Sequence, residues 1–219
     1  MSKRMIIVSG GKIEDDFARA IIEAGEQDCI IAVDRGMDFF YRQKLVPNYI
    51  VGDFDSANEE VADYFRNEVH VPIREYSPVK DSTDTEIAIR LAMTLGCKEM
   101  IVLGATGGRI DHLWANIQCL NIPFKEGIDV CILDSQNRIR LIESDLHLHK
   151  SEAYGSYFSL FPLGGDVYGL TVTGAKYPLH GHTLTSRDSL CVSNEFAEEE
   201  VVISFNSGTV ILMETKDRE

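Results

Sequence analysis

Acidic residues follow two short apolar segments of the chain that are predicted to be strands. Asp34 comes directly after Ile30–Val33, and Asp53 and Asp55 come after Tyr49–Val51. In an open parallel sheet, the carboxyl ends of the strands form the crevice in which ligands bind. We therefore expect these carboxylates to lie close together, and carboxylates so placed repel each other unless a cation neutralises them.

Two further predicted strand ends carry the same kind of residue. The segment Lys80–Asp84, which contains Asp81, follows Val71–Tyr76, and the glycine-rich segment Gly104–His112 follows Met100–Leu103. One acidic pair is common in any protein. Its recurrence at successive strand ends is difficult to explain as structure alone.

These residue types suit a metal ion bound to phosphate. Mg²⁺ prefers carboxylates, water and phosphate oxygens. Gly107 and Gly108 at a helix start let backbone N–H groups approach an anion, and Arg109 adds a fork that matches phosphate oxygens. Gly10 and Gly11 form a second candidate anion loop. The pattern predicts a Mg²⁺–polyphosphate site, although neither the P-loop motif nor the G-x-G-x-x-G motif occurs.

The elements that must position this site alternate along residues 1–134. Short apolar runs alternate with segments of helical periodicity, which predicts an open, mostly parallel α/β sheet. The expected strands are Met5–Ser9, Ile30–Val33, Tyr49–Val51, Val71–Tyr76, Met100–Leu103 and Val130–Leu133. The expected helices are Asp15–Ala24, Met37–Gln43, Glu59–Glu68, Thr83–Leu95 and Ile110–Leu120.

The pattern changes near Ser135, so residues 135–219 are predicted to form a second domain. Short runs split by turn residues replace the helices, which indicates an antiparallel all-β sandwich or barrel. The expected strands are Arg138–Ile142, Tyr157–Phe161, Val167–Val172, Leu190–Val192, Glu200–Phe205 and Thr209–Met213.

Composition excludes several classes of protein. The net charge of −14 over 219 residues disfavours a nucleic-acid binder, because no basic excess is available to release counterions. No apolar run approaches the roughly 18 residues of a membrane span. Five scattered cysteines without C-x-x-C spacing favour buried thiols in a reducing cytoplasm.

The motifs together resemble the thiamine pyrophosphokinase family of the bacterial type over nearly the whole chain. The resemblance rests on Asp34-x-Gly36, on residues 47–56 with Gly-Asp-Phe-Asp-Ser, on residues 80–86, on residues 104–112 with Gly-Gly-Arg-Ile-Asp-His, on Asn116, and on residues 158–163, 169–179 and 193–195. Asn48 and Arg35 depart from the usual pattern, but both lie beside the main acidic positions.

The resemblance implies an activity and an assembly. Members of the family transfer the pyrophosphoryl group of ATP to the hydroxyl of thiamine, which gives thiamine diphosphate and AMP and requires Mg²⁺. It also implies an α/β catalytic domain, a C-terminal β-sandwich for thiamine binding and dimerisation, and a cytoplasmic homodimer with its active site between subunits.

Within that frame each singled-out residue has an expected role. The metal ligands are expected to be Asp34, Asp53, Asp55 and Asp84. The phosphate clamps are expected to be Lys80, Arg109 and the Gly107 and Gly108 amides. Further ATP contacts are expected from Gly10, Gly11, Arg35, Asp81, His112 and Asn116. Thiamine contacts are expected from Ser193 and Asn194, while Asp111 either orients thiamine or accepts its hydroxyl proton.

Several other residues have an ordinary structural interpretation. His147-x-His149 and His180-x-His182 each put two imidazoles on one face of a strand, which could bind Zn²⁺, but no acidic or cysteine pair at metal-ligand spacing accompanies them. Trp114 is expected to pack in the core rather than stack on adenine. Glu198–Glu200 is expected to be a solvated turn.

Three alternative functions remain open on sequence grounds. A nucleotide-sugar transferase would use Asp53-x-Asp55 and turn over UDP- or GDP-sugars. A non-catalytic thiamine or nucleotide sensor would have lost a catalytic carboxylate, and none is missing. A structural β-domain protein would leave the acidic strand ends unexplained.

Overall fold

The computed structural model describes residues 4–25, 28–52, 58–75 and 82–218. The chain divides into two compact units, Met1–Ser135 and Gln136–Glu219, which we call the α/β unit and the sandwich unit. The expected residues Asp53, Asp55, Lys80 and Asp81 lie outside the described residues, as does Tyr76 at the end of an expected strand.

The α/β unit is built on parallel strands in the order β6-β5-β1-β2-β3-β4. Their bounds are Arg4–Val8 for β1, Cys29–Val33 for β2, Tyr49–Gly52 for β3, Ile73–Glu75 for β4, Glu99–Leu103 for β5 and Asp129–Leu133 for β6. The residues Met5–Val8 of β1 are fully buried. A strand covered on both faces reads as a continuous apolar run, which is why the sequence shows no alternation here.

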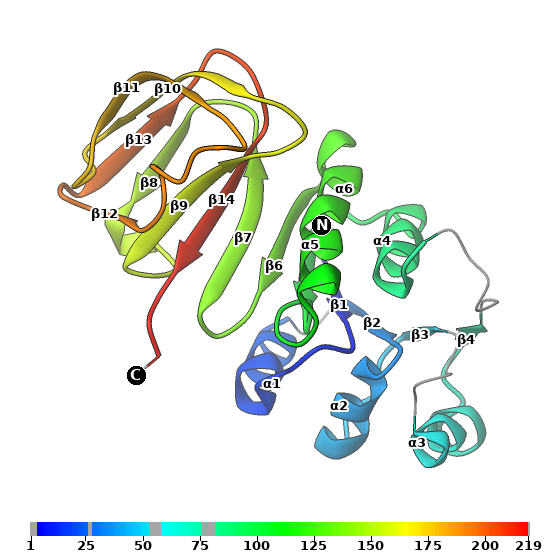
Figure 1. The fold of residues 1–219 in the computed structure, drawn as a ribbon. Coiled ribbons are helices and arrows are strands. Elements are labelled where there is room, and N and C mark those ends of the chain that lie inside the picture. The colour runs from blue at the N-terminus through cyan, green and yellow to red at the C-terminus, as the bar shows by residue number, and fades with distance from the viewer. Residues whose placement is uncertain (1–3, 26–27, 53–57, 76–81, 219) are drawn as a thin grey trace. The chain divides into compact units, whose positions relative to one another are not determined.

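Helices connect these strands in the alternation expected from the sequence (Figure 1). They are α1 at Asp15–Glu23, α2 at Gly36–Gln43, α3 at Glu59–Asp63, α4 at Asp84–Thr94, α5 at Ile110–Cys119 and α6 at Asn121–Lys125, with a π-helix η1 at Tyr64–Val69. The Thr83 side chain caps α4 by accepting a hydrogen bond from the Glu86 amide at 3.2 Å. The Glu86 carboxylate accepts from Arg90 in the next turn.

Strand order reverses beside β1. The chain runs outward from β1 through β2, β3 and β4, and then returns to place β5 on the other side of β1. In open α/β sheets such a switch point leaves a crevice at the carboxyl ends of the two strands that flank it. The segments that follow β1 and β5 are therefore the ones that border the crevice.

Two helical details differ from the sequence expectation. The second half of the expected helix Glu59–Glu68 is the π-helix η1, which ends where His70 takes a φ of 59°. Helix α6 was not predicted; its Pro123 lies in the first turn, where a proline removes no hydrogen bond.

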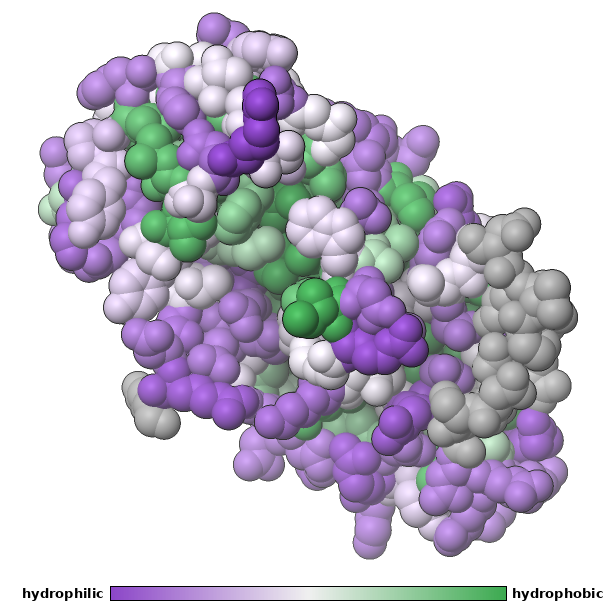
Figure 2. Space-filling model, in the orientation of Figure 1, coloured by the Kyte–Doolittle hydropathy of each residue, from purple (hydrophilic) through white to green (hydrophobic). Residues whose placement is uncertain are grey.

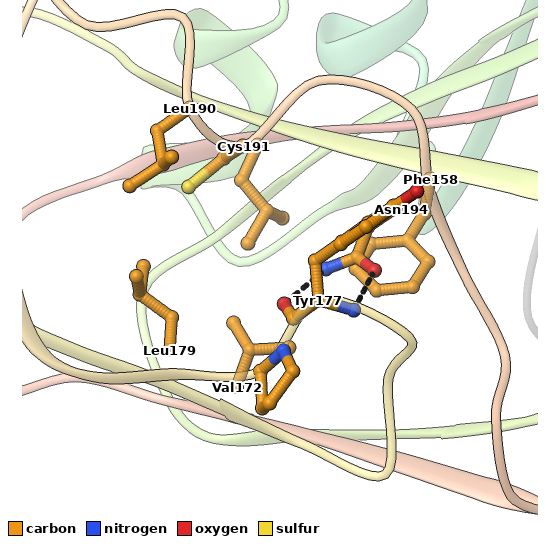
Figure 3. Close-up of a pocket in the computed structure, with 9 residues that line it drawn as sticks. Phe158, Val172, Tyr177, Leu179, Leu190, Cys191 and Asn194 are labelled. Atoms are coloured by element: carbon orange, nitrogen blue, oxygen red, sulfur yellow. Dashed lines mark hydrogen bonds between the residues drawn. The ribbon is translucent and has the colours of Figure 1, made fainter.

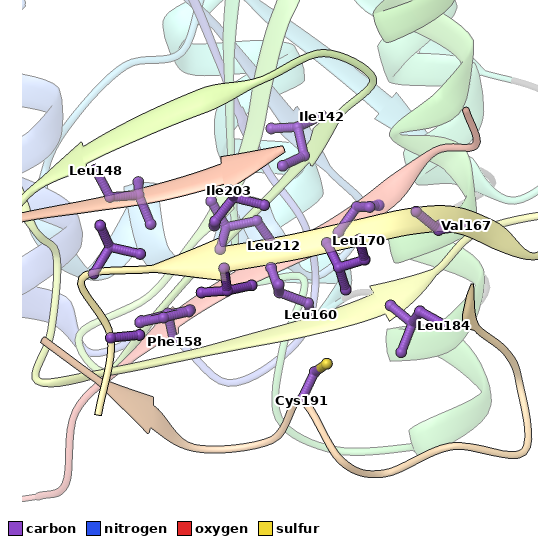
Figure 4. Close-up of a cluster of buried hydrophobic side chains, with 14 residues drawn as sticks. Ile142, Leu148, Phe158, Leu160, Val167, Leu170, Leu184, Cys191, Ile203 and Leu212 are labelled. Carbon is purple, nitrogen blue, oxygen red and sulfur yellow. The ribbon is translucent and has the colours of Figure 1, made fainter. Parts of the chain in front are cut away.

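The sandwich unit consists of two antiparallel arrays, β12-β9-β14-β7 and β11-β10-β13-β8. The strands are β7 at Asn137–Ile142, β8 at Leu146–His149, β9 at Tyr157–Pro162, β10 at Val167–Thr173, β11 at Leu179–Leu184, β12 at Asn194–Glu195, β13 at Glu200–Ser204 and β14 at Val210–Thr215, with a short 3₁₀ helix at Lys150–Glu152. Side chains from both arrays, including Phe158, Leu170 and Leu212, form one buried cluster (Figure 4). This confirms the predicted β-sandwich.

The strand expectations in the sandwich unit need two corrections. The predicted strand Leu190–Val192 is wrong, because the Leu190 amide is held in a turn by Asp188 and the Leu190 side chain is 61% exposed. Strands β8 and β11 were not among the strands predicted with bounds, although the two histidine pairs that they contain were expected to lie on strands.

Most of the surface in view is hydrophilic, and apolar residues form smaller areas within it (Figure 2). Ile110 and Trp114 on α5 are 80% and 51% exposed. The expectation that Trp114 packs in the core is therefore wrong: it lies on the outward face of its helix. Within the described part of the chain, no helix is long and apolar enough to cross a membrane.

All five cysteines are free thiols. Burial raises the pKa of the Cys97 and Cys191 thiols to about 11. Since the thiolate is the reactive form, these two cysteines act as small apolar side chains, as expected.

Candidate functional site

Two glycine loops meet at the switch point of the α/β unit. The Gly11 amide after β1 donates to the Gly104 carbonyl after β5 at 2.9 Å. A Cβ atom added to Gly11 would lie 2.4 Å from the same carbonyl oxygen. Only glycine therefore allows the loop after β1 to approach the loop after β5, and the two candidate anion loops lie side by side.

The loop after β5 is held in its shape by its neighbours. Gly104 and Gly107 take φ values of 63° and 74°, in the left-handed region that favours glycine. The buried Asn116 amide donates to the Ala105 carbonyl at 3.0 Å, and the Thr106 hydroxyl donates to the Asp134 carboxylate at 2.5 Å. Asn116, expected to contact ATP, is thus shown to brace the loop.

The loop leads directly into helix α5. Arg109 occupies the N-cap position without a side-chain capping bond, and Ile110 begins the helix. The first amides of a helix and its dipole attract anions. Gly107 and Gly108 therefore lie where a phosphate group would meet both the loop and the helix start.

Asp34 lies at the carboxyl end of β2, and its backbone is hydrogen-bonded to the end of β3. Its amide donates to the Val51 carbonyl at 2.9 Å, and its φ is 52°. A Cβ atom at Gly52 would lie only 2.9 Å from Asp34 Oδ1. The missing side chain of Gly52 thus makes room for the Asp34 carboxylate beside the residue that precedes Asp53.

Asp84 is placed at the same edge by its neighbour on α4. The Thr85 hydroxyl lies 2.9 Å from the Ser9 hydroxyl, and this buried hydrogen bond ties the start of α4 to the end of β1. Asp84 is the first residue of α4. Ser9 and Thr85 are 76 residues apart, so no local pattern in the sequence could have revealed this anchor.

Arg35 and Gly36 lie against the first loop. A Cβ atom at Gly10 would lie 3.2 Å from the Arg35 Cβ, and one at Gly36 would lie 2.1 Å from the Val8 carbonyl oxygen. Gly36 therefore lets the start of α2 pack on the end of β1. The exposed side chain of Arg35 begins beside Gly10.

Arg109 and Asp111 form a bidentate ion pair. Arg109 Nη2 lies 2.5 Å from Asp111 Oδ2, and Nε lies 3.1 Å from Oδ1. Both side chains are well exposed, at 74% and 61%. The hydrogen bonds from Arg109, aided by one from the His112 amide, lower the pKa of Asp111 to about 2. A carboxylate with so low a pKa is a weak proton acceptor.

The two residues expected to contact thiamine have different surroundings in the sandwich unit. The Asn194 side chain is buried and pairs with the Tyr177 backbone, donating to its carbonyl at 2.8 Å and accepting from its amide at 3.0 Å (Figure 3). Ser193 takes a φ of 56°, and its amide donates to the Ser159 hydroxyl at 3.0 Å. Asn194 therefore positions Tyr177, a role that the sequence did not indicate.

A cavity of about 50 Å³ lies beside this pair. It is mostly apolar, with Asn194 as its amide-bearing side chain. Its lining is Phe158, Leu160, Val172, Tyr177, Pro178, Leu179, Leu190, Cys191 and Asn194 (Figure 3). Tyr177 is 58% exposed and Leu190 61% exposed, so the rim of the cavity is aromatic and aliphatic.

The residue types expected as metal ligands suit a hard cation. The carboxylates of Asp34 and Asp84 are the kind of donor that Mg²⁺ prefers, and Gly52 leaves room for the first of them. Among the described residues, no three histidine, cysteine or acidic side chains stand ready to hold a metal ion. A complete site would need the segment of Asp53 and Asp55, which is not among them.

These features are those of a phosphate-binding α/β protein with an added β-sandwich. The family model "Thiamin pyrophosphokinase, catalytic domain" matches residues 23–132, and "Thiamin pyrophosphokinase, vitamin B1 binding domain" matches residues 143–210. The chain belongs to the thiamin pyrophosphokinase family.

Individual relatives agree with this assignment. The thiamine pyrophosphokinase of Bacillus subtilis (strain 168) is 32% identical over 188 residues, which are 85% of this chain and 87% of the relative. Its crystal structure matches with a TM-score of 0.85 at 30% identity, over 99% of this chain and 100% of that chain. The thiamin pyrophosphokinase of Geobacillus thermodenitrificans matches with a TM-score of 0.83 at 29% identity, over 99% of both chains.

Proposed function

We propose that this chain transfers the pyrophosphoryl group of ATP to the hydroxyl of thiamine and releases AMP. Membership of the family supports the reaction. The structural observation that carries the proposal is the meeting of the two glycine loops beside β1, through the Gly11–Gly104 hydrogen bond. Such backbone-lined loops bind phosphate chains, because amides and a helix start converge on the anion.

ATP is expected to bind along these loops. Gly10, Gly11, Gly107 and Gly108 offer backbone N–H groups, and Arg109 offers a fork for phosphate oxygens. Lys80, Asp81, Arg35 and His112 are proposed as further contacts. Asn116 contributes by holding the Ala105 carbonyl, and therefore the loop, in place.

Mg²⁺ is proposed to bind between Asp34, Asp53, Asp55 and Asp84. When bound there, it would offset the negative charge of the phosphates and of the carboxylates themselves. The proposal is supported by the space that Gly52 leaves for the Asp34 carboxylate.

Arg109 and Asp111 are proposed to act at the transferred group. Attack by the thiamine hydroxyl at the β-phosphorus builds up charge on the transferred group and on the bridging oxygen, which a guanidinium stabilises. The lowered pKa of Asp111, about 2, favours an orienting role over that of a proton acceptor.

Thiamine is proposed to bind through the sandwich unit beside the Tyr177 cavity. Ser193 and Asn194 border the loop that presents Tyr177, and an aromatic ring suits both an apolar heterocycle and a positive charge. We further propose a homodimer with its active site between subunits and a cytoplasmic location, for which the five free thiols are suited.

The test is an assay of AMP release from ATP and Mg²⁺, with and without thiamine. We expect AMP and thiamine diphosphate in equal amounts, and no AMP when thiamine is omitted. AMP release that does not depend on thiamine, or no release at all, would contradict the proposal. A light-scattering mass of one chain at working concentrations would contradict the dimer.

A further inference from the structure

Two histidines of the sandwich unit converge on one carboxylate. His147 Nδ1 lies 2.9 Å from Glu200 Oε1, and His149 Nε2 lies 3.7 Å from the same oxygen. The histidines are two residues apart on β8, while Glu200 begins β13. The acidic residue that the histidines contact is not one of their neighbours in the sequence: strand pairing supplies it from 51 residues beyond His149.

The strand register explains why the three side chains meet. His149 is directly opposite Glu200, and His147 is opposite Val202, in the antiparallel pair of β8 and β13. Alternate residues of β8 point away from the core: Leu148 is buried, whereas both histidines are exposed. The imidazoles and the carboxylate therefore share the outer face of the sheet.

The backbone of Glu200 is anchored from two sides. On the β8 side, the Lys150 amide donates to the Glu199 carbonyl at 2.9 Å. On the β10 side, Gly174 packs so closely that a Cβ atom there would lie 2.0 Å from the Glu200 carbonyl oxygen. The acidic residue is thus part of a paired strand rather than of the solvated turn that the run Glu198–Glu200 suggested.

We propose that His147, His149 and Glu200 form a binding site for a divalent transition-metal ion such as Zn²⁺. Two imidazoles and one carboxylate, with an open fourth position for water, are a known ligand set of zinc. Ligand atoms around a tetrahedral zinc lie about 3.4 Å apart, as its bond lengths of about 2.1 Å require. The two nitrogen–oxygen distances, 2.9 and 3.7 Å, lie on either side of this value.

A metal would still require the side chains to move. In the described part of the chain, no three histidine, cysteine or acidic side chains are placed so that they could hold a metal ion without moving. The three side chains are 58%, 51% and 43% exposed, so they lie at the surface, where an imidazole can rotate towards the ion more readily than in the core. The site lies on the edge strand β8, and an ion there would link β8 to β13.

The second histidine pair of the unit provides a matched comparison. His182 contacts one carboxylate oxygen of Asp188. The other oxygen accepts a hydrogen bond from the Leu190 amide and so stabilises a turn. The structure gives His180 no part in that contact. The convergence of two imidazoles on one oxygen therefore distinguishes the His147 pair.

The test is calorimetric titration of the full chain with zinc chloride, without ATP or thiamine and with excess Mg²⁺ to keep zinc off the other carboxylates. We expect one zinc per chain in the wild type. His147→Ala, His149→Ala and Glu200→Gln should each weaken binding more than about tenfold, since even loss of a supporting contact costs that much. His180→Ala should bind zinc as the wild type does.

Thermal unfolding gives a second readout that involves no catalysis. Zinc should raise the unfolding midpoint of the wild type and of His180→Ala, and a chelator should reverse the rise. Absence of binding up to roughly 100 µM zinc, or equal affinity in Glu200→Gln, would overturn the proposal, leaving only a surface hydrogen bond. Because no substrate is present, the result is independent of the proposed pyrophosphoryl transfer.

Discussion

The two units use their polar side chains in opposite ways. In the α/β unit, the described groups singled out for chemistry lie on loops and helix starts, apart from the buried Asn116 within α5, and the Arg109–Asp111 pair is well exposed. In the sandwich unit, the most deeply buried polar side chains form hydrogen bonds within the fold. Glu214 is 1% exposed and accepts two hydrogen bonds from Arg138, at 2.6 and 2.8 Å, while Asn194 serves the Tyr177 backbone.

The comparison teaches how each unit holds its geometry. Close backbone approach, made possible by Gly11, Gly36 and Gly52, shapes the strand ends of the α/β unit, where the Asn116 side chain also braces a loop. In the sandwich unit, the Asn194 side chain fixes the Tyr177 loop by pairing with its backbone. Substitutions at the strand ends of the first unit should therefore change activity most, and substitutions of buried pairs in the second unit should change stability most.

The largest expected effect is on stability and comes from Glu214→Gln. The change leaves Arg138 and the nearby Arg140 without their buried carboxylate, whose oxygen lies 3.4 Å from Arg140 Nε. Breaking a buried pair in this way costs about 3 kcal/mol. Urea unfolding measures the loss, and Glu23→Gln, which breaks an exposed pair with Arg19, should cost less than about 0.5 kcal/mol. Equal costs for the two variants would refute the contrast between the units.

Asp34→Asn should affect activity and leave the fold intact. The amide keeps the size of the side chain but removes the charge proposed for Mg²⁺, so kcat/KM should fall by about 100-fold or more. Steady-state assays at saturating Mg²⁺ measure the fall. The exposed Asp16→Asn on α1 is the control and should retain wild-type activity. Near-normal turnover in Asp34→Asn would remove Asp34 from the metal site.

Gly11→Ala should lower both stability and activity, each by less than the two variants above. The added Cβ would lie 2.4 Å from the Gly104 carbonyl oxygen, so the two loops must separate. We expect a loss of about 1–3 kcal/mol in stability and a raised KM for ATP. Gly165→Ala meets no atom within 4 Å and should change neither value. An unchanged KM for ATP in Gly11→Ala would show that the loop does not contact the nucleotide.

The smallest expected effect concerns pH. Arg109 lowers the pKa of Asp111 to about 2, so this carboxylate is ionised at every pH above about 4. Its contribution to stability is present above the ordinary pKa and is lost as pH falls towards 2. Asp111→Asn should therefore lower activity without moving any limb of the pH–rate profile above pH 5, as about ten assays across the range would show. A displaced limb would identify Asp111 as the proton acceptor.

Much of the fold followed from local patterns. The alternation of apolar runs and helical segments predicted the α/β unit, because buried parallel strands and amphipathic helices have different periods. The predicted strand at Leu190–Val192 failed because an apolar triplet carries no information on whether the backbone turns, as it does at Asp188. The histidine pairs were expected to lie on strands, but the bounds of β8 and β11 were not predicted, because strand pairing rather than an apolar run defines them.

In the candidate site too, sequence patterns indicated some residues but not the contacts that hold them. Asp34, Asp84, Arg109 and the glycine pairs were predicted from their residue types and their positions after strands, and their roles at a phosphate site stay a prediction. The supporting contacts could not be predicted, since Ser9 meets Thr85 across 76 residues and Asn194 meets Tyr177 across 17. Trp114 was misplaced because helical spacing alone does not say which face of α5 is covered.

By itself, the sequence determined the family, the order of the elements and the acidic, glycine-rich character of the strand ends, because these depend on residue type and spacing along the chain. Only the tertiary structure decided which polar side chains form hydrogen bonds and ion pairs with which others. It committed Asn194 to Tyr177, placed Asp111 under the influence of Arg109, and brought Glu200 to His147 and His149. The reason is physical: hydrogen bonds and ion pairs act over a few ångströms in space, and only the folded chain sets those distances.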